Sequence, residues 1–120
     1  MRVGIGYDSH RFSEDGSLLL GGVEIPDSPG LSGHSDGDAV LHALIDALLG
    51  AAALGNIGEH YPDTDPAYAG VDSATLVADT AGRLGRAGFK IGNIDITVIA
   101  ERPKIQPHVP AMIERISSIL

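Results

Sequence analysis

The sequence has no cysteine and no tryptophan, and these absences exclude several classes of protein. Without cysteine there is no disulfide framework, no thiolate zinc site and no cysteine nucleophile. Aromatic residues make up only 4% of the chain, so platforms for stacking bases are scarce. Basic residues are few as well, eight against sixteen acidic ones, and a net charge of −8 disfavours binding to a nucleic-acid backbone. An anionic ligand would have to be held locally, by metal ions, helix N-termini or backbone amides.

Long apolar runs are also lacking: none approaches the ~18 residues that a membrane span needs. Met1 leads directly into Arg-Val-Gly-Ile-Gly, which resembles neither a signal peptide nor a transit peptide. With 120 residues, 43% of them apolar, the chain is expected to form one globular domain, 1–120, in the cytoplasm. We expect neither a membrane nor a nucleic-acid partner.

Three helices are predicted from apolar periodicity and end signals. The clearest spans 38–54, where a buried stripe recurs at i, i+3, i+4 and i+7, with Ser35 or Asp36 as its cap and Gly55 at its end. The second runs from about Ser73 to Ala87, capped by Asp72 or Ser73. The third begins near Pro107 or His108.

Three extended segments are predicted outside these helices. They are a short buried strand at 2–6, a stretch at 18–25 bent at Gly21-Gly22, and an alternating strand at 89–100. Composition predicts loops at 26–37 and 55–71. The order favours an α/β (α+β) fold, a small mixed β-sheet with helices on one face. Gly4-x-Gly6 lacks the third glycine and the following helix of a dinucleotide-binding turn, which excludes a Rossmann reading.

Asp8, His10 and His42 form the first candidate site. In extended backbone, residues i and i+2 point to the same side, so Asp8 and His10 are presented together. His42 lies on an apolar helix with Asp38 and Asp46 one turn either side, as a metal ligand with supporting carboxylates would. Two imidazoles and one carboxylate leave a tetrahedral position open, as in catalytic zinc sites, although non-haem iron uses the same ligand types. The structural alternatives are a turn-capping Asp8, a surface His10 and a satisfied core His42.

Three further clusters have both a functional and a structural interpretation. His34-Ser35, beside a helix start, is either an anion site or an ordinary cap. The Tyr61-Pro-Asp-Thr-Asp65 loop offers partners for sugar hydroxyls or is simply a turn. Arg102 and Lys104, at a predicted strand end, are either ligand contacts or a solvated charge run.

Together these motifs closely resemble the 2-C-methyl-D-erythritol 2,4-cyclodiphosphate synthase family of the non-mevalonate route of isoprene biosynthesis. The matching stretches begin with Gly4-Ile-Gly-Tyr-Asp8-Ser-His10-Arg-Phe12 and Gly33-His-Ser-Asp-Gly-Asp-Ala-Val-Leu-His42. Tyr61-Pro-Asp-Thr-Asp65 and Glu101-x-Pro-Lys104 follow in the same order. The resemblance implies a ferredoxin-like α/β subunit that assembles as a homotrimer, with active sites between subunits.

The implied enzyme is a phosphorus–oxygen lyase (EC 4.6.1.12). It would convert 4-diphosphocytidyl-2-C-methyl-D-erythritol 2-phosphate to the 2,4-cyclodiphosphate with release of CMP. The substrate's own 2-phosphate is the nucleophile, so the lack of cysteine is no obstacle. The resemblance places Zn²⁺ on Asp8, His10 and His42, and a second ion, Mg²⁺ or Mn²⁺, across the diphosphate.

The resemblance also assigns the remaining site residues. His34 is the catalytic residue, stabilising developing charge, and the phosphates and sugar are contacted by Asp8, Ser9, His10, His34 and Ser35. The sugar is further held by Asn56, Ile57, Gly58, Tyr61, Pro62, Asp63, Thr64 and Asp65. The cytidine pocket, with a lysine that reaches phosphate, is formed by Ala100, Glu101, Arg102, Pro103, Lys104, Ile105 and Gln106.

Two departures from the family pattern affect these expectations. Position 56 is Asn where the family usually has Asp, which removes a charge. Family members also continue into a strand whose Glu ligates the second metal, so this chain is expected to lack that C-terminal strand and helix and the ligand. The rival functions are a small zinc phosphohydrolase and an inactive fragment that binds metal and nucleotide.

Overall fold

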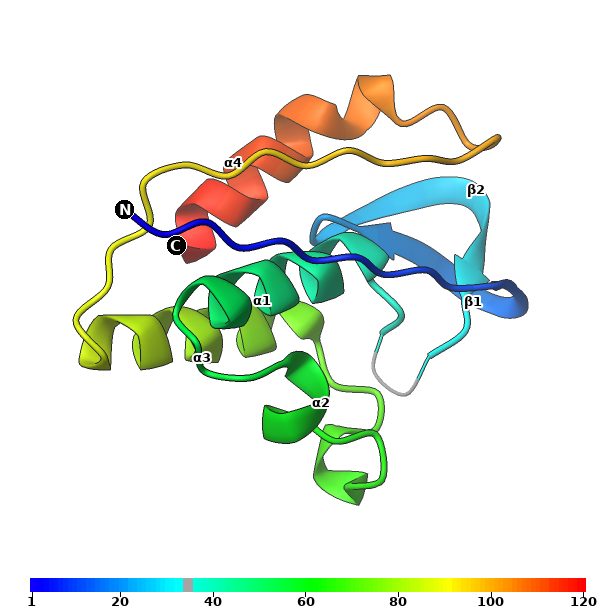
Figure 1. Cartoon of the computed structure of the whole chain (residues 1–120). Helices are drawn as coiled ribbons and strands as arrows, with labels where there is room; N and C mark the ends of the chain where they lie inside the picture. The colour runs from blue at the N-terminus through cyan, green and yellow to red at the C-terminus, as the bar shows by residue number, and fades with distance from the viewer. Residues whose placement is uncertain (34–35) are drawn as a thin grey trace.

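The computed structural model describes residues 1–33 and 36–120, which form a molecule of 41 × 32 × 21 Å (Figure 1). Its strands and main helices are β1 (Phe12–Leu20), β2 (Val23–Leu31), α1 (Ala39–Ala51), α2 (Ile57–His60), α3 (Ser73–Arg86) and α4 (Val109–Ile119). Two short 3-10 turns are η1 (Pro66–Tyr68) and η2 (Gln106–His108). Within the described residues, no helix is both long and apolar enough to cross a membrane.

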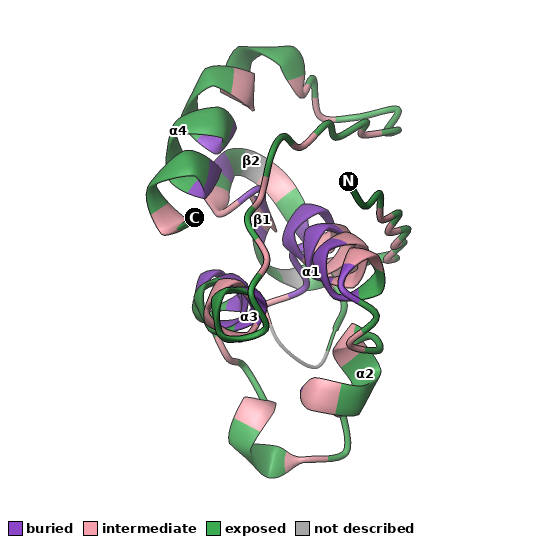
Figure 2. Cartoon of the chain, turned by 60° about the vertical axis from the view of Figure 1, so that its left-hand side comes forward, coloured by how far each residue is buried: buried purple, intermediate pink, exposed green. Residues whose placement is uncertain are grey.

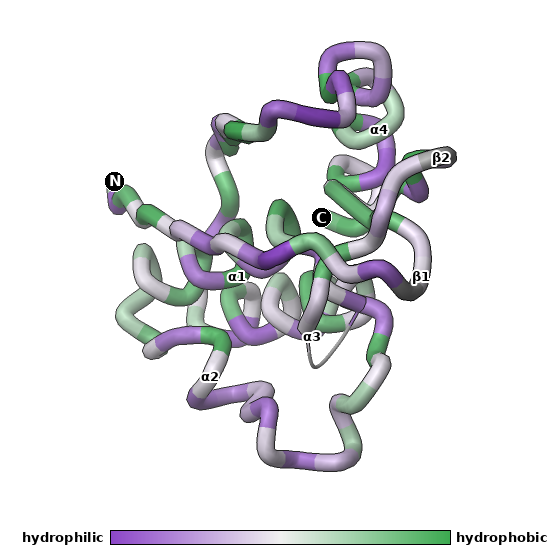
Figure 3. The backbone as a smooth tube through the Cα atoms, turned by 90° about the vertical axis from the view of Figure 1, so that its right-hand side faces the viewer, coloured by the Kyte–Doolittle hydropathy of each residue, from purple (hydrophilic) through white to green (hydrophobic). Residues whose placement is uncertain are grey.

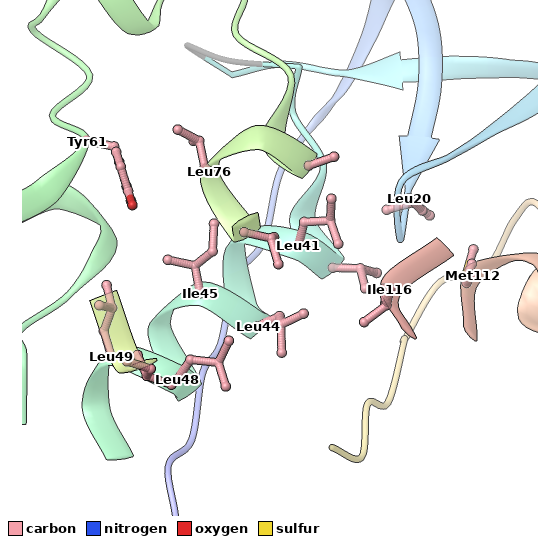
Figure 4. Packing of buried hydrophobic residues seen from close by; sticks show 14 of the residues in the cluster. Leu20, Leu41, Leu44, Ile45, Leu48, Leu49, Tyr61, Leu76, Met112 and Ile116 are labelled. Carbon is pink, nitrogen blue, oxygen red and sulfur yellow. The ribbon is translucent and has the colours of Figure 1, made fainter. Parts of the chain in front are cut away.

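Helix α1 is the centre of the core. All six members of its predicted apolar stripe are buried, and they pack against residues of α3, α4 and β1 (Figure 4). Figure 2 shows the buried faces of α1 and α3 turned toward each other, whereas α2 is exposed or half-buried. The stripe consists of Val40, Leu41, Leu44, Ile45, Leu48 and Leu49.

The ends of α1 differ from the prediction. Its cap is Asp38, whose side chain accepts a hydrogen bond from the Leu41 N–H at 3.0 Å, and not Asp36; Ser35 lies outside the described residues. The helix ends at Ala51, and the chain reverses through Ala53, which has a φ of 57°, before Gly55 is reached. Asp38 adjoins the first helical residue, so its carboxylate reaches the free N–H groups directly.

The other two long helices match the prediction closely. Asp72 caps α3 by accepting from the Ala74 N–H at 2.9 Å, and the helix ends one residue before Ala87. Helix α4 begins at Val109, immediately after η2. Both pack apolar residues into the core, Leu76, Val77 and Leu84 from α3 and Met112 and Ile116 from α4, whereas Ile113 of α4 is 61% exposed.

The bent stretch expected at 18–25 is a β-hairpin. Gly21 and Gly22 have φ values of 62° and 75° and form the two-residue connection between β1 and β2, for which positive φ at both positions is required. Strand β2 continues to Leu31 and so takes up the first half of the segment predicted as a loop at 26–37. Its Pro29 lies where the register shifts opposite Ser17, so the missing N–H of proline is tolerated there.

The predicted strands at 2–6 and 89–100 are extended, but neither pairs in a sheet among the described residues. The prediction that 2–6 is buried is wrong, because Val3 and Ile5 are exposed. In the second segment Ile94 and Val98 are half-buried and Ile99 is exposed, as the alternation predicts, but Ile96, expected on the same face as Ile94 and Val98, is 38% exposed. The α/β class is confirmed, and the sheet described is the antiparallel pair β1–β2.

Candidate metal centre

Asp8, His10 and His42 meet at one point, as the sequence predicts. The Asp8 Oδ2 lies 2.7 Å from the His10 Nε2 and 3.3 Å from the His42 Nδ1. The two ring nitrogens are 3.3 Å apart. All three side chains are half-buried, and one ligand atom from each lies within 4.8 Å of the others.

Two glycines bring these residues together. The segment before Asp8 runs along α1 (Figure 1), and a Cβ at Gly4 or Gly6 would lie 1.9 or 1.8 Å from the carbonyl oxygen of Ala47 or Ala43. Only glycine allows such an approach of backbone to helix. The close contact carries Asp8 and His10 to the first turns of α1, where His42 lies.

The orientation of His10 suits a metal ligand. Its Nδ1 lies 2.6 Å from the carbonyl oxygen of Ser32, which can only accept, so the Nδ1–H is the donor. In the neutral ring, Nε2 then presents a lone pair to the Asp8 carboxylate. A lone pair and a carboxylate repel at this distance unless a cation or a proton lies between them, so the residues fit a metal ion.

Asp8 is prepared to carry a negative charge. Burial by itself would raise the pKa of this carboxyl, but the influence of the His42 and His10 rings beside it outweighs burial and lowers the pKa below 3.8. Asp8 is therefore ionised near neutral pH, as a metal ligand must be.

The supporting carboxylates predicted for His42 act elsewhere. Asp38 accepts from the N–H groups of Gly21 and Gly22, which ties the hairpin turn to α1. Asp46 accepts from the Ile57 N–H at 2.7 Å and so anchors α2. Both carboxylates thus stabilise the backbone, and the helical stripe was the wrong place to find the partner of His42.

The partner of His42 comes from another helix. Its Nε2 lies 2.8 Å from the Ser73 Oγ, at the start of α3. Ser73 in turn binds Asp36, through its hydroxyl at 2.5 Å and its N–H at 2.8 Å. Sequence analysis missed this connection because 31 residues separate His42 from Ser73, and no local spacing signals it.

A cavity of about 390 Å³ opens beside the three ligands. Ile57, Gly58, Tyr61 and Asp63, which the resemblance assigns to the sugar, line it together with Asp8, His10 and His42. Asp46 also lines it, as do Gly33, Tyr68, Val71 and Leu76, to which the sequence analysis gave no role. The hydropathy colouring of Figure 3 shows many hydrophilic positions in the chain around α2, below the apolar core.

Tyr61 anchors the loop that forms one wall of this cavity. Its hydroxyl donates to Asp79 of α3 and lies 3.2 Å from the hydroxyl of Thr80. Arg83 binds Asp79 at 3.0 Å and its guanidinium lies 5.7 Å from the centre of the Tyr61 ring. Burial and the Asp79 carboxylate raise the pKa of Tyr61, so it remains a hydrogen-bond donor.

Several predicted site residues do not line the cavity. Asn56 and Asp65 cap α2 and η1 through their side chains. The segment 100–106 lies at the opposite end of the molecule from α2 (Figure 1), and its Arg102–Pro103 peptide is cis. Ser9, Pro62 and Thr64 lie outside the lining as well. His34 and Ser35 are outside the described residues.

Comparison with known proteins identifies the family to which the chain belongs. The profile of the YgbB family matches residues 1–120. A 2-C-methyl-D-erythritol 2,4-cyclodiphosphate synthase of Ralstonia pickettii (strain 12J) is 55% identical over 120 residues, which is all of this chain and 71% of the relative.

Solved structures agree. The bifunctional IspDF from Campylobacter jejuni matches with a TM-score of 0.95 and 44% identity, over 99% of this chain and 32% of that one. A 2C-methyl-D-erythritol-2,4-cyclodiphosphate synthase in a CDP-bound form matches with a TM-score of 0.91 and 41% identity, over 98% and 79%. The chain therefore belongs to the YgbB family, that of the 2-C-methyl-D-erythritol 2,4-cyclodiphosphate synthases.

Proposed function

We propose that this protein converts 4-diphosphocytidyl-2-C-methyl-D-erythritol 2-phosphate to 2-C-methyl-D-erythritol 2,4-cyclodiphosphate and CMP. The observation that carries the proposal is the convergence of Asp8, His10 and His42 at the edge of an open cavity. The family membership and the CDP-bound structural relative support the same substrate class. The protein would be a lyase of isoprene biosynthesis, and its cytoplasmic location stays a prediction.

The reaction requires no nucleophile from the protein. An oxygen of the substrate's 2-phosphate attacks the β-phosphorus and forms the new P–O bond. The bond from the β-phosphorus to the oxygen shared with the α-phosphate breaks, and CMP leaves with that oxygen and its electron pair. The protein's task is therefore to position the two phosphates and balance their charge, as is usual in phosphoryl transfer.

Zinc is the metal ion that we assign to Asp8, His10 and His42. Three protein ligands with one open position are typical of catalytic zinc sites. When bound, zinc would act as a Lewis acid toward a phosphate oxygen. We include a second ion, Mg²⁺ or Mn²⁺, bridging the diphosphate in the proposal. Among residues 1–33 and 36–120 only the Asp8 group has three clustered ligands, so we assign no residue to that ion.

The remaining roles are proposed from the family pattern. Ile57, Gly58, Tyr61 and Asp63 line the cavity and would hold the erythritol hydroxyls. His34 would be the catalytic residue that stabilises charge on the transferring phosphate, with Ser35 beside it. The Asn56 side chain already binds Glu59, accepting from its N–H and donating to its carboxylate at 3.4 Å, so its second amide hydrogen would have to make such a contact.

We propose a homotrimer with active sites between subunits. The proposed cytidine-binding segment 100–106 does not line the cavity beside the metal ligands of the same chain, so a neighbouring copy would supply it. Lys104 of this segment would bind phosphate. Exposed apolar side chains on the extended segments, notably Val3, Ile5 and Ile99, offer surface for the assembly.

Phosphorus NMR with parallel detection of CMP tests the proposed reaction. We expect the cyclodiphosphate and CMP to appear together, activity to stop when a chelator removes the metal, and zinc to restore it. Release of inorganic phosphate with no cyclic product would contradict the proposal and indicate a zinc phosphohydrolase. Binding of CMP without any turnover would also contradict it.

A further inference from the structure

Ser73, the first residue of α3, links His42 to the carboxylate of Asp36. We propose that Ser73 and Asp36 are positioning residues that fix the ring orientation and the tautomer of His42 so that its Nδ1 faces Asp8 and His10. The proposal rests on the metal centre of the proposed function and deepens it. Ser73 is completely buried, so water cannot replace its hydroxyl.

The direction of each hydrogen bond follows from counting protons. The Ser73 hydroxyl has one proton, and its Oγ lies 2.5 Å from the Asp36 Oδ1. An ionised carboxylate can only accept, so Ser73 donates to Asp36. The Ser73 Oγ is then an acceptor toward the His42 Nε2 at 2.8 Å, and the proton of the neutral ring must be on Nε2.

Asp36 is itself held firmly. Its Oδ2 accepts from the Ser73 N–H at 2.8 Å, and its Oδ1 also accepts from the Asp38 N–H at 3.0 Å. The carboxylate therefore cannot easily turn away from the Ser73 hydroxyl. The N–H groups of Ser73 and Asp38 therefore fix the carboxylate at the start of the hydrogen-bond chain that runs from Asp36 through Ser73 to His42.

The consequence concerns the other ring nitrogen. With the proton on Nε2, the His42 Nδ1 carries a lone pair directed at the Asp8 carboxylate, 3.3 Å away. Ser32 imposes the corresponding arrangement on His10 through its carbonyl group. Each imidazole thus has one nitrogen fixed by the protein and the other left for the metal, as metal-binding histidines usually require.

The test compares Ser73→Ala with Thr75→Ala. Thr75 lies in the same first turn of α3, and its hydroxyl donates to the Asp72 carbonyl oxygen. Loss of an outer partner of a ligand costs about 10- to 100-fold in metal affinity. We expect Ser73→Ala to weaken zinc binding by that factor in a chelator competition assay, and Thr75→Ala to bind zinc within about twofold of the original protein.

Asp36→Asn tests the direction of the chain. An amide can donate to the Ser73 Oγ, which frees the serine proton for the His42 Nε2 and favours the tautomer with hydrogen on Nδ1. We expect zinc affinity to fall again. Because both residues act through one path, the double variant should bind zinc no more weakly than the worse single variant.

Nitrogen-15 NMR of the metal-free protein at about pH 8 reads the position of the ring proton of His42 directly. We expect the Nε2–H form of His42 in the original protein and a shift toward Nδ1–H in both variants. An unchanged tautomer together with zinc affinity within twofold in Ser73→Ala would overturn the positioning role alone. A failure of the original protein to bind zinc would contradict the metal centre itself.

Discussion

His42 joins the two halves of the metal centre, because it binds Ser73 on one side and faces Asp8 and His10 on the other. We expect His42→Ala to weaken zinc binding by more than about 100-fold, beyond the loss of an outer partner. The chain should remain folded, since the side chain is only half-buried. His60→Ala is the matched control, because the His60 ring binds the Leu54 carbonyl group and lies outside the ligand set. Equal zinc affinity in the two variants would contradict the assignment.

Asp38 is a second residue whose effect can be measured, through the pH dependence of stability. Burial raises its pKa from 3.8 to about 6, against the opposing effect of the N–H groups of Leu41, Gly22 and Gly21. Between these two pH values the folded protein binds more protons than the unfolded chain, so stability falls as the pH rises from about 4 to about 6. The expected decrease is up to about 3 kcal/mol.

Asp38→Asn cannot titrate and therefore isolates this effect. Denaturant unfolding of the metal-free proteins at about pH 4 and pH 7 should show the original protein losing up to about 3 kcal/mol relative to the variant. The other carboxylates contribute equally to both proteins and cancel. A difference in unfolding free energy that stays constant with pH would mean that Asp38 has the same pKa in both states.

For individual residues, the sequence predicts those contacts that follow from local spacing along the chain. Asp8 and His10 share one side of an extended segment, and His42 interrupts an apolar helix, so the ligand set could be found. Ser73 and Asp36 could not, because only the packing of α3 beside α1 brings them to His42. The same limit explains why Asp38 and Asp46 were assigned to His42: they share its helical stripe, but tertiary contacts direct them to backbone groups.

At the scale of elements, the contact between the first segment and α1 determines the geometry of the site. A methyl group at Gly6 would overlap the Ala43 carbonyl oxygen at 1.8 Å, so Gly6→Ala must push the segment off the helix. We expect a loss of about 1–3 kcal/mol in stability and weaker zinc binding, because Asp8 and His10 move with the segment.

Gly50→Ala is the control for this substitution, since a Cβ at Gly50 of α1 meets nothing within 4 Å. It should stabilise the helix by up to about 1 kcal/mol and leave zinc binding unchanged. Thermal unfolding and zinc titration of both variants provide the comparison. Unchanged stability and affinity in Gly6→Ala would show that the close approach does not exist in solution.

Helices were easier to predict than strands in this chain. The apolar period of α1 and the Asp72 cap of α3 are local signals, and both elements were found near their true bounds. The bend of the hairpin at Gly21-Gly22 was predicted, but the full length of β2 was missed because its prolines and a glycine resemble a loop, although Pro29 lies at a register shift where no ladder hydrogen bond is needed. The segments 2–6 and 89–100 have strand-like patterns, but pairing depends on partners that a pattern does not specify.

At the scale of the whole molecule, exposed apolar surface indicates association. Ile5 and Ile99 are 90% and 94% exposed, on extended segments without sheet partners in the described chain. We expect light scattering at micromolar concentration to give about three times the chain mass of 12.4 kDa. Ile99→Asp should shift the distribution toward the monomer, whereas Lys90→Asp, an exposed position, should not. A monomer mass for the original protein would contradict the trimer.

The central claim is that Asp8, His10 and His42 together hold one metal ion at the entrance of the cavity. Anomalous diffraction at the zinc edge, from crystals grown with zinc and a cytidine diphosphate, tests it most directly. The account predicts one strong peak between these three side chains, with a phosphate oxygen of the nucleotide as its neighbour. A peak held by other residues, or no peak between these three, would contradict the account.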